Sequence, residues 1–157
     1  MGFFPAGTYD LFLTHAWHYT DEWQRVVAAL DGYLPGKWRN WSIPWHDTSI
    51  ERHSAQGKAA LEKLLDGHIS MSSAILLLPE VRNLPDGAMW LEKQLRIAAH
   101  HSKPVIGVVQ DENSLRRSLL SSLGIRSNFP VDLRGRVNEV SGRNAAAIIK
   151  AVDRFCR

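Results

Sequence analysis

The chain has 157 residues, a length that fits one domain. Hydrophobic residues make up 45% and charged residues 22%, which is typical of a globular chain and excludes a disordered or collagen-like one. The formal net charge is +3, and the basic excess lies in residues 111–157, whereas most tryptophans precede residue 46. Because nucleic-acid binding needs basic and stacking side chains together, we expect no nucleic-acid partner.

The compartment also follows from composition. No run of 18 apolar residues occurs, so we expect no membrane span and no membrane partner. The start, Met1–Pro5, lacks the basic and apolar regions of a signal peptide. Cys156 is the only cysteine, which excludes an internal disulfide. We expect a single domain over residues 1–157 in the cytoplasm.

The first predicted elements are a strand and a helix. Tyr9–Leu13 is short and apolar, as a buried strand is. Thr20 then caps a helix whose first turn is acidic and which ends near Gly32. Its apolar residues recur at helical spacing and form one face: Trp23, Val26, Val27 and Leu30.

The middle of the chain predicts two strands around a helix. Trp41–Pro44 is a short apolar segment that predicts a strand, and residues 46–54 predict a loop. The helix that follows ends at Gly67 and has an apolar face formed by Leu61, Leu64 and Leu65. Ser73–Leu78 is a continuous apolar run, as in a strand covered on both faces.

Alternation continues to the end of the chain. After a turn-rich loop at Asn83–Gly87, a helical stripe runs to His100, and Pro104–Val109 predicts a buried strand. Asn113 or Ser114 caps a helix that Gly124 ends, and residues 125–136 look irregular. A last strand is expected at Val137–Val140. Asn144 then caps a helix with Ile148, Val152 and Phe155 on one face.

About five alternating strands and helices predict an α/β fold, with a parallel sheet between two layers of helices. Ligands of such sheets bind beyond the carboxyl ends of the strands, so the segments after the strands are the ones to inspect. There is no glycine-rich phosphate loop and no nucleophile elbow. His15 and Asp47 follow neighbouring strands, and they either belong to a site or tie two loops together. The histidines do not match known zinc spacings, so we expect no metal site.

Four segments resemble the Toll/interleukin-1 receptor (TIR) family, and in particular the TIR-like group that includes the sensor of the bacterial Thoeris anti-phage system. They are Tyr9–Trp17, Asn40–Asp47, Trp90–Ala98 and Ser102–Val108. The resemblance implies a three-layer flavodoxin-like fold with a five-stranded parallel sheet of order 2-1-3-4-5. It also implies a bacterial defence or signalling protein that binds NAD or a related nucleotide.

The activity that the resemblance implies is NAD cleavage or cyclisation to an ADP-ribose-type signal, with NAD as substrate and no tightly bound cofactor. It implies a homo-oligomer, a phage-derived trigger and a separate effector protein. The residues expected to contact the nucleotide follow strand ends or begin the helix after one: His15, Ala16, Trp17, Trp45, His46, Asp47 and Trp90. We expect them to converge with Gln94 at one sheet edge.

The expected catalytic position departs from the family pattern. The family has a glutamate four residues after the tryptophan, and this chain has Gln94 there. Glutamine keeps the shape of glutamate but cannot carry its charge. Glu92 lies two residues away, about 200° around a helix, and replaces the carboxylate only if the helix is shifted.

Two functions remain open at this stage: an NAD-consuming enzyme with Gln94 or Glu92 at its catalytic position, and a catalytically degenerate module that binds a nucleotide or assembles with partners. The sequence alone predicts slow or absent NAD cleavage, and a gain of activity on Gln94→Glu.

Overall fold

The computed structural model describes residues 8–16, 19–42, 54–109, 133–138 and 145–156. The described strands form one sheet of order β2-β1-β3-β4-β5, and every neighbouring pair is parallel. The strands are β1 (Tyr9–Leu13), β2 (Trp38–Asn40), β3 (Ala74–Leu77), β4 (Val105–Val109) and β5 (Leu133–Asn138).

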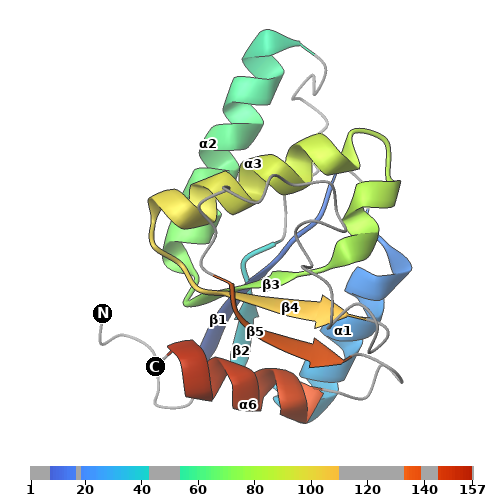
Figure 1. Cartoon of the computed structure of the whole chain (residues 1–157), viewed down its shortest axis with the longest axis vertical. Helices are drawn as coiled ribbons and strands as arrows, with labels where there is room; N and C mark the ends of the chain where they lie inside the picture. Colours follow the sequence, from blue (N-terminus) through green and yellow to red (C-terminus); the bar gives the residue numbers. More distant parts are fainter. Residues whose placement is uncertain (1–7, 17–18, 43–53, 110–132, 139–144, 157) are drawn as a thin grey trace.

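Helices cover both faces of the sheet (Figure 1). In Figure 1, α2 and α3 lie on one side of the strands, and α1 and α6 lie on the other. Their bounds, with one 3-10 helix, are α1 (Asp21–Tyr33), α2 (Ala55–Met71), η1 (Pro79–Asn83), α3 (Gly87–His100) and α6 (Ala145–Cys156). The predicted α/β architecture with a parallel sheet is confirmed, and the arrangement is compatible with a flavodoxin-like fold.

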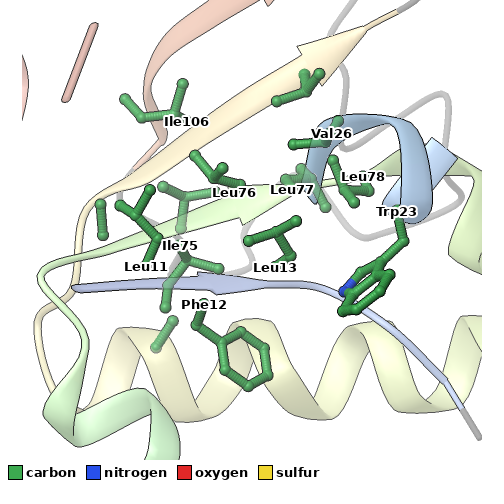
Figure 2. Packing of buried hydrophobic residues seen from close by; sticks show 14 of the residues in the cluster. Leu11, Phe12, Leu13, Trp23, Val26, Ile75, Leu76, Leu77, Leu78 and Ile106 are labelled. Carbon is green, nitrogen blue, oxygen red and sulfur yellow. The ribbon is translucent and has the colours of Figure 1, made fainter. Parts of the chain in front are cut away.

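Strand β1 lies in the interior of the sheet, as its apolar sequence predicts. Leu11, Phe12 and Leu13 have no exposed surface. Figure 2 shows Phe12 on the opposite face of β1 from Leu11 and Leu13, because successive side chains of a strand alternate. Both faces of β1 are therefore covered. Strand β3 is buried at every residue too, and this confirms the prediction from its apolar run.

Helix α1 begins where its capping residue predicts. The Thr20 hydroxyl accepts a hydrogen bond from the Trp23 N–H at 3.0 Å, and Asp21 and Glu22 occupy the first turn. Such a cap satisfies one of the N–H groups that a helix start leaves without a partner. Trp23, Val26 and Leu30 are buried on one face, as their spacing predicts.

The prediction of the second strand was wrong. The sequence predicts a strand at Trp41–Pro44, but β2 spans Trp38–Asn40, and Trp41 and Ser42 form a turn. Strand β2 is at the edge of the sheet and Arg39 is exposed, so its sequence need not be apolar. The more apolar segment, Trp41–Pro44, lies just after the strand, and this is why the strand was predicted there.

Helix α2 also differs from the prediction. It passes through Gly67 and ends at Met71, and Leu64 is exposed rather than buried. Gly67 has open space around it, and an exposed glycine lowers helix stability by about 1 kcal/mol without ending the helix. The buried stripe is Leu61, Leu65 and Ile69, and this continues one turn beyond the predicted stop.

Three further expectations have mixed outcomes. Strand β5 begins at Leu133, within a segment predicted to be irregular. Its sequence is rich in polar residues, as a strand at a sheet edge can be, and the prediction from apolar runs therefore missed it. Part of the predicted loop is helical, since η1 reaches Asn83 and α3 begins at Gly87. In α6, Ile148 and Val152 are buried as predicted. The helix predicted before Gly124, its caps and the side chain of Phe155 lie outside the described residues.

The start of α3 depends on a close backbone contact. Asp86 precedes the helix in the left-handed conformation, with φ 57°. A Cβ atom on Gly87 would lie 1.8 Å from the carbonyl oxygen of Val81. Only glycine therefore lets η1 and α3 meet this closely, and the contact sets where α3 begins above the sheet.

Candidate functional site at the carboxyl edge of β1 and β3

The carboxyl ends of β1 and β3 are held together beyond their last paired residues. The Thr14 N–H donates to the Leu76 carbonyl at 3.0 Å. The Thr14 hydroxyl accepts a hydrogen bond from the Leu78 N–H at 2.8 Å. In the order β2-β1-β3, the chain direction around the sheet reverses between β1 and β3. Ligand sites of open α/β sheets lie at this kind of position.

Gln94 binds the backbone of the residue that follows Thr14. Its Oε1 atom accepts a hydrogen bond from the His15 N–H at 3.0 Å, and its Nε2 atom donates to the His15 carbonyl. The Gln94 side chain is completely buried. One side-chain amide thus pairs with both polar groups of one residue, as a neighbouring strand would. His15 and Gln94, two of the residues expected to converge at this edge, are therefore in direct contact.

Glu92 lies on the other side of α3. It is exposed, and its carboxylate forms an ion pair with Arg96 at 2.9 Å. The helix is regular from Gly87 to His100, so the separation from Gln94 of about 200° that its period implies is present. A shifted helix start that would turn Glu92 into the site does not occur.

An aromatic cluster continues from His15 toward α1. The His15 ring is 1% exposed and lies 5.4 Å from Phe12 and 5.5 Å from Tyr19, measured between ring centroids. Tyr19 stacks on Trp23 with centroids 3.8 Å apart and planes 14° apart. His15 Nδ1 lies 3.1 Å from the carbonyl oxygen of Ala16, which is itself buried. The segment after β1 is therefore packed into the protein.

Ser42 joins this cluster to the end of β2. Its hydroxyl accepts a hydrogen bond from Trp23 Nε1, and its carbonyl accepts one from the Tyr19 hydroxyl, both at 3.2 Å. The Asn40 side chain accepts from the Ser42 N–H at 2.9 Å, which closes a turn right after the strand. Burial raises the pKa of Tyr19 to about 12, so its phenol stays protonated and remains a donor.

Three residues of this cluster, Tyr19, Asn40 and Ser42, were not predicted from the sequence. The pattern Asn40-Trp41-Ser42 was a usable signal, because an asparagine side chain often binds the N–H two residues on. Tyr19 directly precedes the helix cap, and an aromatic residue there commonly packs on the first turn. Its bond to Ser42, by contrast, joins residues 23 positions apart, and no local pattern contains it.

Glu22 was not predicted either. Its side chain is completely buried, and Oε1 accepts a hydrogen bond from the Glu80 N–H at 3.0 Å, just after β3. The signal was its spacing, because Glu22, Val26 and Leu30 lie at i, i+4 and i+8 on the buried face of α1. A carboxylate in that stripe needs a donor, and the backbone that follows β3 supplies it.

The other predicted nucleotide contacts divide into two groups. Trp90 is 2% exposed and belongs to the hydrophobic core, one turn before Gln94 on α3. Trp17, Trp45, His46 and Asp47 lie outside the described residues. Among the described histidine, cysteine and acidic residues, no three lie together as a metal site would require.

The site thus combines an inward-turned amide, a buried imidazole, an aromatic pair and a neutral phenol at the carboxyl edge of a parallel sheet. Comparison of the chain with protein-family models, with curated proteins and with solved structures finds no match. Of the helices in the described part, none combines the length and hydropathy that crossing a bilayer requires.

Proposed function

We propose that the protein is a catalytically silent TIR-like module of a bacterial defence or signalling system, which binds NAD or a related ADP-ribose-type nucleotide. Gln94 carries the proposal, because both ends of its amide are occupied by the backbone of His15. The proposal includes the finer fold assignment, a TIR-type flavodoxin-like sheet of five strands in the order 2-1-3-4-5.

The chemistry of NAD cleavage supports the silent state. Breaking the bond between nicotinamide and ribose builds positive charge on the ribose, and a fixed anion stabilises that charge. Gln94 is neutral, and to reach a ribose it would have to leave two buried hydrogen bonds. Glu92 is exposed and paired with Arg96. Helix α3 therefore offers no carboxylate to the sheet edge.

The location of the cluster supports nucleotide binding. The segments after β1 and β2 meet at Ser42, beside the reversal in strand order. The four segments that resemble the TIR family include those that follow β1 and β2. A nucleotide held there without being cleaved would act as a signal, and a separate effector protein would respond to the bound state.

A paired measurement of nucleotide binding and of NAD turnover tests both parts of the proposal, that the protein binds the nucleotide and that it does not cleave it. Purified protein is titrated with NAD and with ADP-ribose by calorimetry, and the same mixtures are separated chromatographically for released nicotinamide. We expect heat of binding with at least one nucleotide and no nicotinamide. The matched controls are Glu92→Gln, which should bind equally, and AMP, which lacks the second ribose.

The two parts fail separately. Nicotinamide release by the native protein, at a rate proportional to protein concentration, would contradict the silent state. Absence of binding to both nucleotides at millimolar concentration would contradict the nucleotide-binding role and leave an assembly module.

A further inference from the structure

Asn40, the last residue of β2, has a side-chain amide whose orientation is fixed by its neighbours. Its Oδ1 atom accepts the Ser42 N–H at 2.9 Å, and it also accepts the Ser42 hydroxyl. A backbone N–H only donates, so the amide atom that faces it is the oxygen and not the nitrogen. Both lone pairs of that oxygen are then in use, and the Nδ2 atom lies on the other side of the amide.

The Nδ2 atom of Asn40 is a buried donor. In the described part of the chain, no acceptor lies within hydrogen-bond distance of it. The residue as a whole is half-buried, so the amide lies close to the surface. Buried polar groups of folded proteins are nearly always satisfied, and one that is not calls for an explanation such as a bound molecule. Asn40 thus has N–H groups that remain to be accepted.

The surroundings of Asn40 are neutral and partly aromatic. Its partner Ser42 is bound in turn by the Trp23 indole and the Tyr19 phenol, and these two rings stack on each other. The phenol keeps its proton, because burial raises the pKa of Tyr19 to about 12. None of these three groups carries a charge that would offset the desolvation of a phosphate. The acceptor that fits is therefore a neutral atom of a flat ring system.

We propose that Asn40 recognises the adenine base of the nucleotide, with Nδ2 donating a hydrogen bond to a ring nitrogen. The inference rests on the proposed nucleotide-binding function, and it names the part of the nucleotide that the end of β2 contacts. Adenine is the base that NAD and ADP-ribose share. The nicotinamide carboxamide fits less well, because its own amino group sits beside its oxygen and the saturated Asn40 oxygen has no lone pair to accept it.

Binding of ADP-ribose by Asn40→Ser, measured by calorimetry, tests the assignment. Serine keeps a side-chain oxygen for the Ser42 N–H, since it forms the same kind of turn, and it lacks the Nδ2 donor. We expect the dissociation constant to rise about tenfold, the effect of one net hydrogen bond. The melting temperature of the nucleotide-free protein should change by less than about 3 °C, because no bond of Nδ2 is lost.

Asn83→Ser is the matched control for this variant. It makes the same change at an exposed position, the last residue of η1, and it should bind ADP-ribose as the native protein does. The backbone amide spectrum adds a direct readout, because side-chain N–H signals appear in it too. The pair of signals missing from Asn40→Ser should shift when the native protein binds ADP-ribose, and the pair missing from Asn83→Ser should not.

Deaza analogues of ADP-ribose, with CH in place of one adenine ring nitrogen at a time, identify the acceptor. One analogue should bind the native protein about tenfold more weakly than ADP-ribose does. The same analogue should bind Asn40→Ser as well as ADP-ribose does, because the two changes remove one and the same bond. If the variant melts early, the native protein alone decides, since equal binding of all analogues would overturn the assignment.

Other outcomes would overturn the role of Asn40 and leave nucleotide binding intact. They are equal affinity of Asn40→Ser and the native protein, or a loss that adds to that of every analogue. A loss confined to NAD, with ADP-ribose unaffected, would place the acceptor on the nicotinamide and would also overturn the assignment to adenine. Absence of binding by the native protein would instead overturn this inference and the proposed function together.

Discussion

At the scale of single residues, Gln94 is a substitute for a missing strand. The Thr14 N–H donates to the Leu76 carbonyl of β3, and one residue further on a side chain binds both backbone polar groups of His15. The glutamine amide supplies one donor and one acceptor instead. A buried peptide group without such partners would cost about 1–3 kcal/mol. Glutamine is suited to this role because it has both functions, whereas a carboxylate only accepts.

Gln94→Glu is therefore expected to lower the free energy of unfolding, whatever its effect on NAD cleavage. The introduced carboxylate, when ionised, would keep the bond from the His15 N–H but turn its other oxygen toward the His15 carbonyl. We expect a loss of about 1–3 kcal/mol in the free energy of unfolding at about pH 7, measured by urea denaturation. The Glu92→Gln control, on the exposed side, should stay within about 0.5 kcal/mol of the native protein.

The same variant has a defined pH dependence. In its protonated form, the introduced carboxyl group could donate to the His15 carbonyl, so the folded state would raise the pKa of that group. The loss relative to the native protein should be small near the unfolded pKa, about 4.3, and should grow as pH rises above it. A loss that is independent of pH between about 4 and 7 would contradict this account of the Gln94 amide.

His68 predicts a second pH effect. Burial lowers the pKa of His68 below its ordinary value of 6.5, and its ring lies 6.2 Å from the Trp41 ring. The unfolded state therefore binds the proton more readily, and the stability from the neutral ring is lost as pH falls below about 6.5. His68→Gln should remove part of the fall in melting temperature between about pH 7 and pH 5.5.

How far the sequence could predict the site follows from these residues. The period of a regular helix was enough to separate Gln94 from Glu92, because both lie within a few residues of each other. The His15 contact with Gln94 spans 79 positions, and it was expected because the one follows a strand end and the other lies in the helix after a later strand. Glu22 could have been found from its spacing, but its partner is 58 positions away. Local patterns contain one partner of such a hydrogen bond and not the other.

At the scale of elements, the junction between η1 and α3 depends on Gly87. Gly87→Ala would place a methyl group against the Val81 carbonyl oxygen, and backbone on both sides must move to relieve the overlap. We expect a loss of about 3 kcal/mol or more, at the upper end of overpacking effects.

Two other glycines are matched controls for Gly87→Ala. Gly36 has φ 70° but open space, so Gly36→Ala should cost about 1 kcal/mol of strain. Gly67 is helical with open space, so Gly67→Ala should gain about 1 kcal/mol. Thermal denaturation of the three variants should give this order, and equal effects at Gly87 and Gly36 would show that the close contact is not limiting.

The elements also show which strands a sequence can predict. Strands β1 and β3 are covered on both faces, so their apolar runs located them to within a residue. Strands β2 and β5 lie at the edges of the sheet, and their sequences, Trp-Arg-Asn and Leu-Arg-Gly-Arg-Val-Asn, carry polar residues. At an edge the fold requires only hydrogen bonding on one side, and this leaves a weaker mark on composition.

At the scale of the whole molecule, α6 closes the core. The Tyr9 hydroxyl donates to the Asp153 carboxylate at 2.9 Å, and Ile148 and Val152 are buried with the sheet residues. A chain that ends at residue 138 would expose the face of β4 and β5 on which α6 packs. We expect it to lose the cooperative thermal transition of the full chain and to bind a hydrophobic dye. A sharp transition in the shortened chain would show that α6 is dispensable.

The interior place of β1 has a consequence for synthesis on the ribosome. Strand β1 emerges well before its neighbour β3, which begins at Ala74, 65 residues after Tyr9 (74 minus 9). At about 5–20 residues per second, the most apolar strand of the amino-terminal half waits roughly 3–13 s for that partner. During this interval the described elements that precede β3 and can cover it are α1, β2 and α2. Nascent chains arrested just before Ala74 should therefore be the ones that chaperones retain most strongly, and release should follow soon after β3 leaves the exit tunnel.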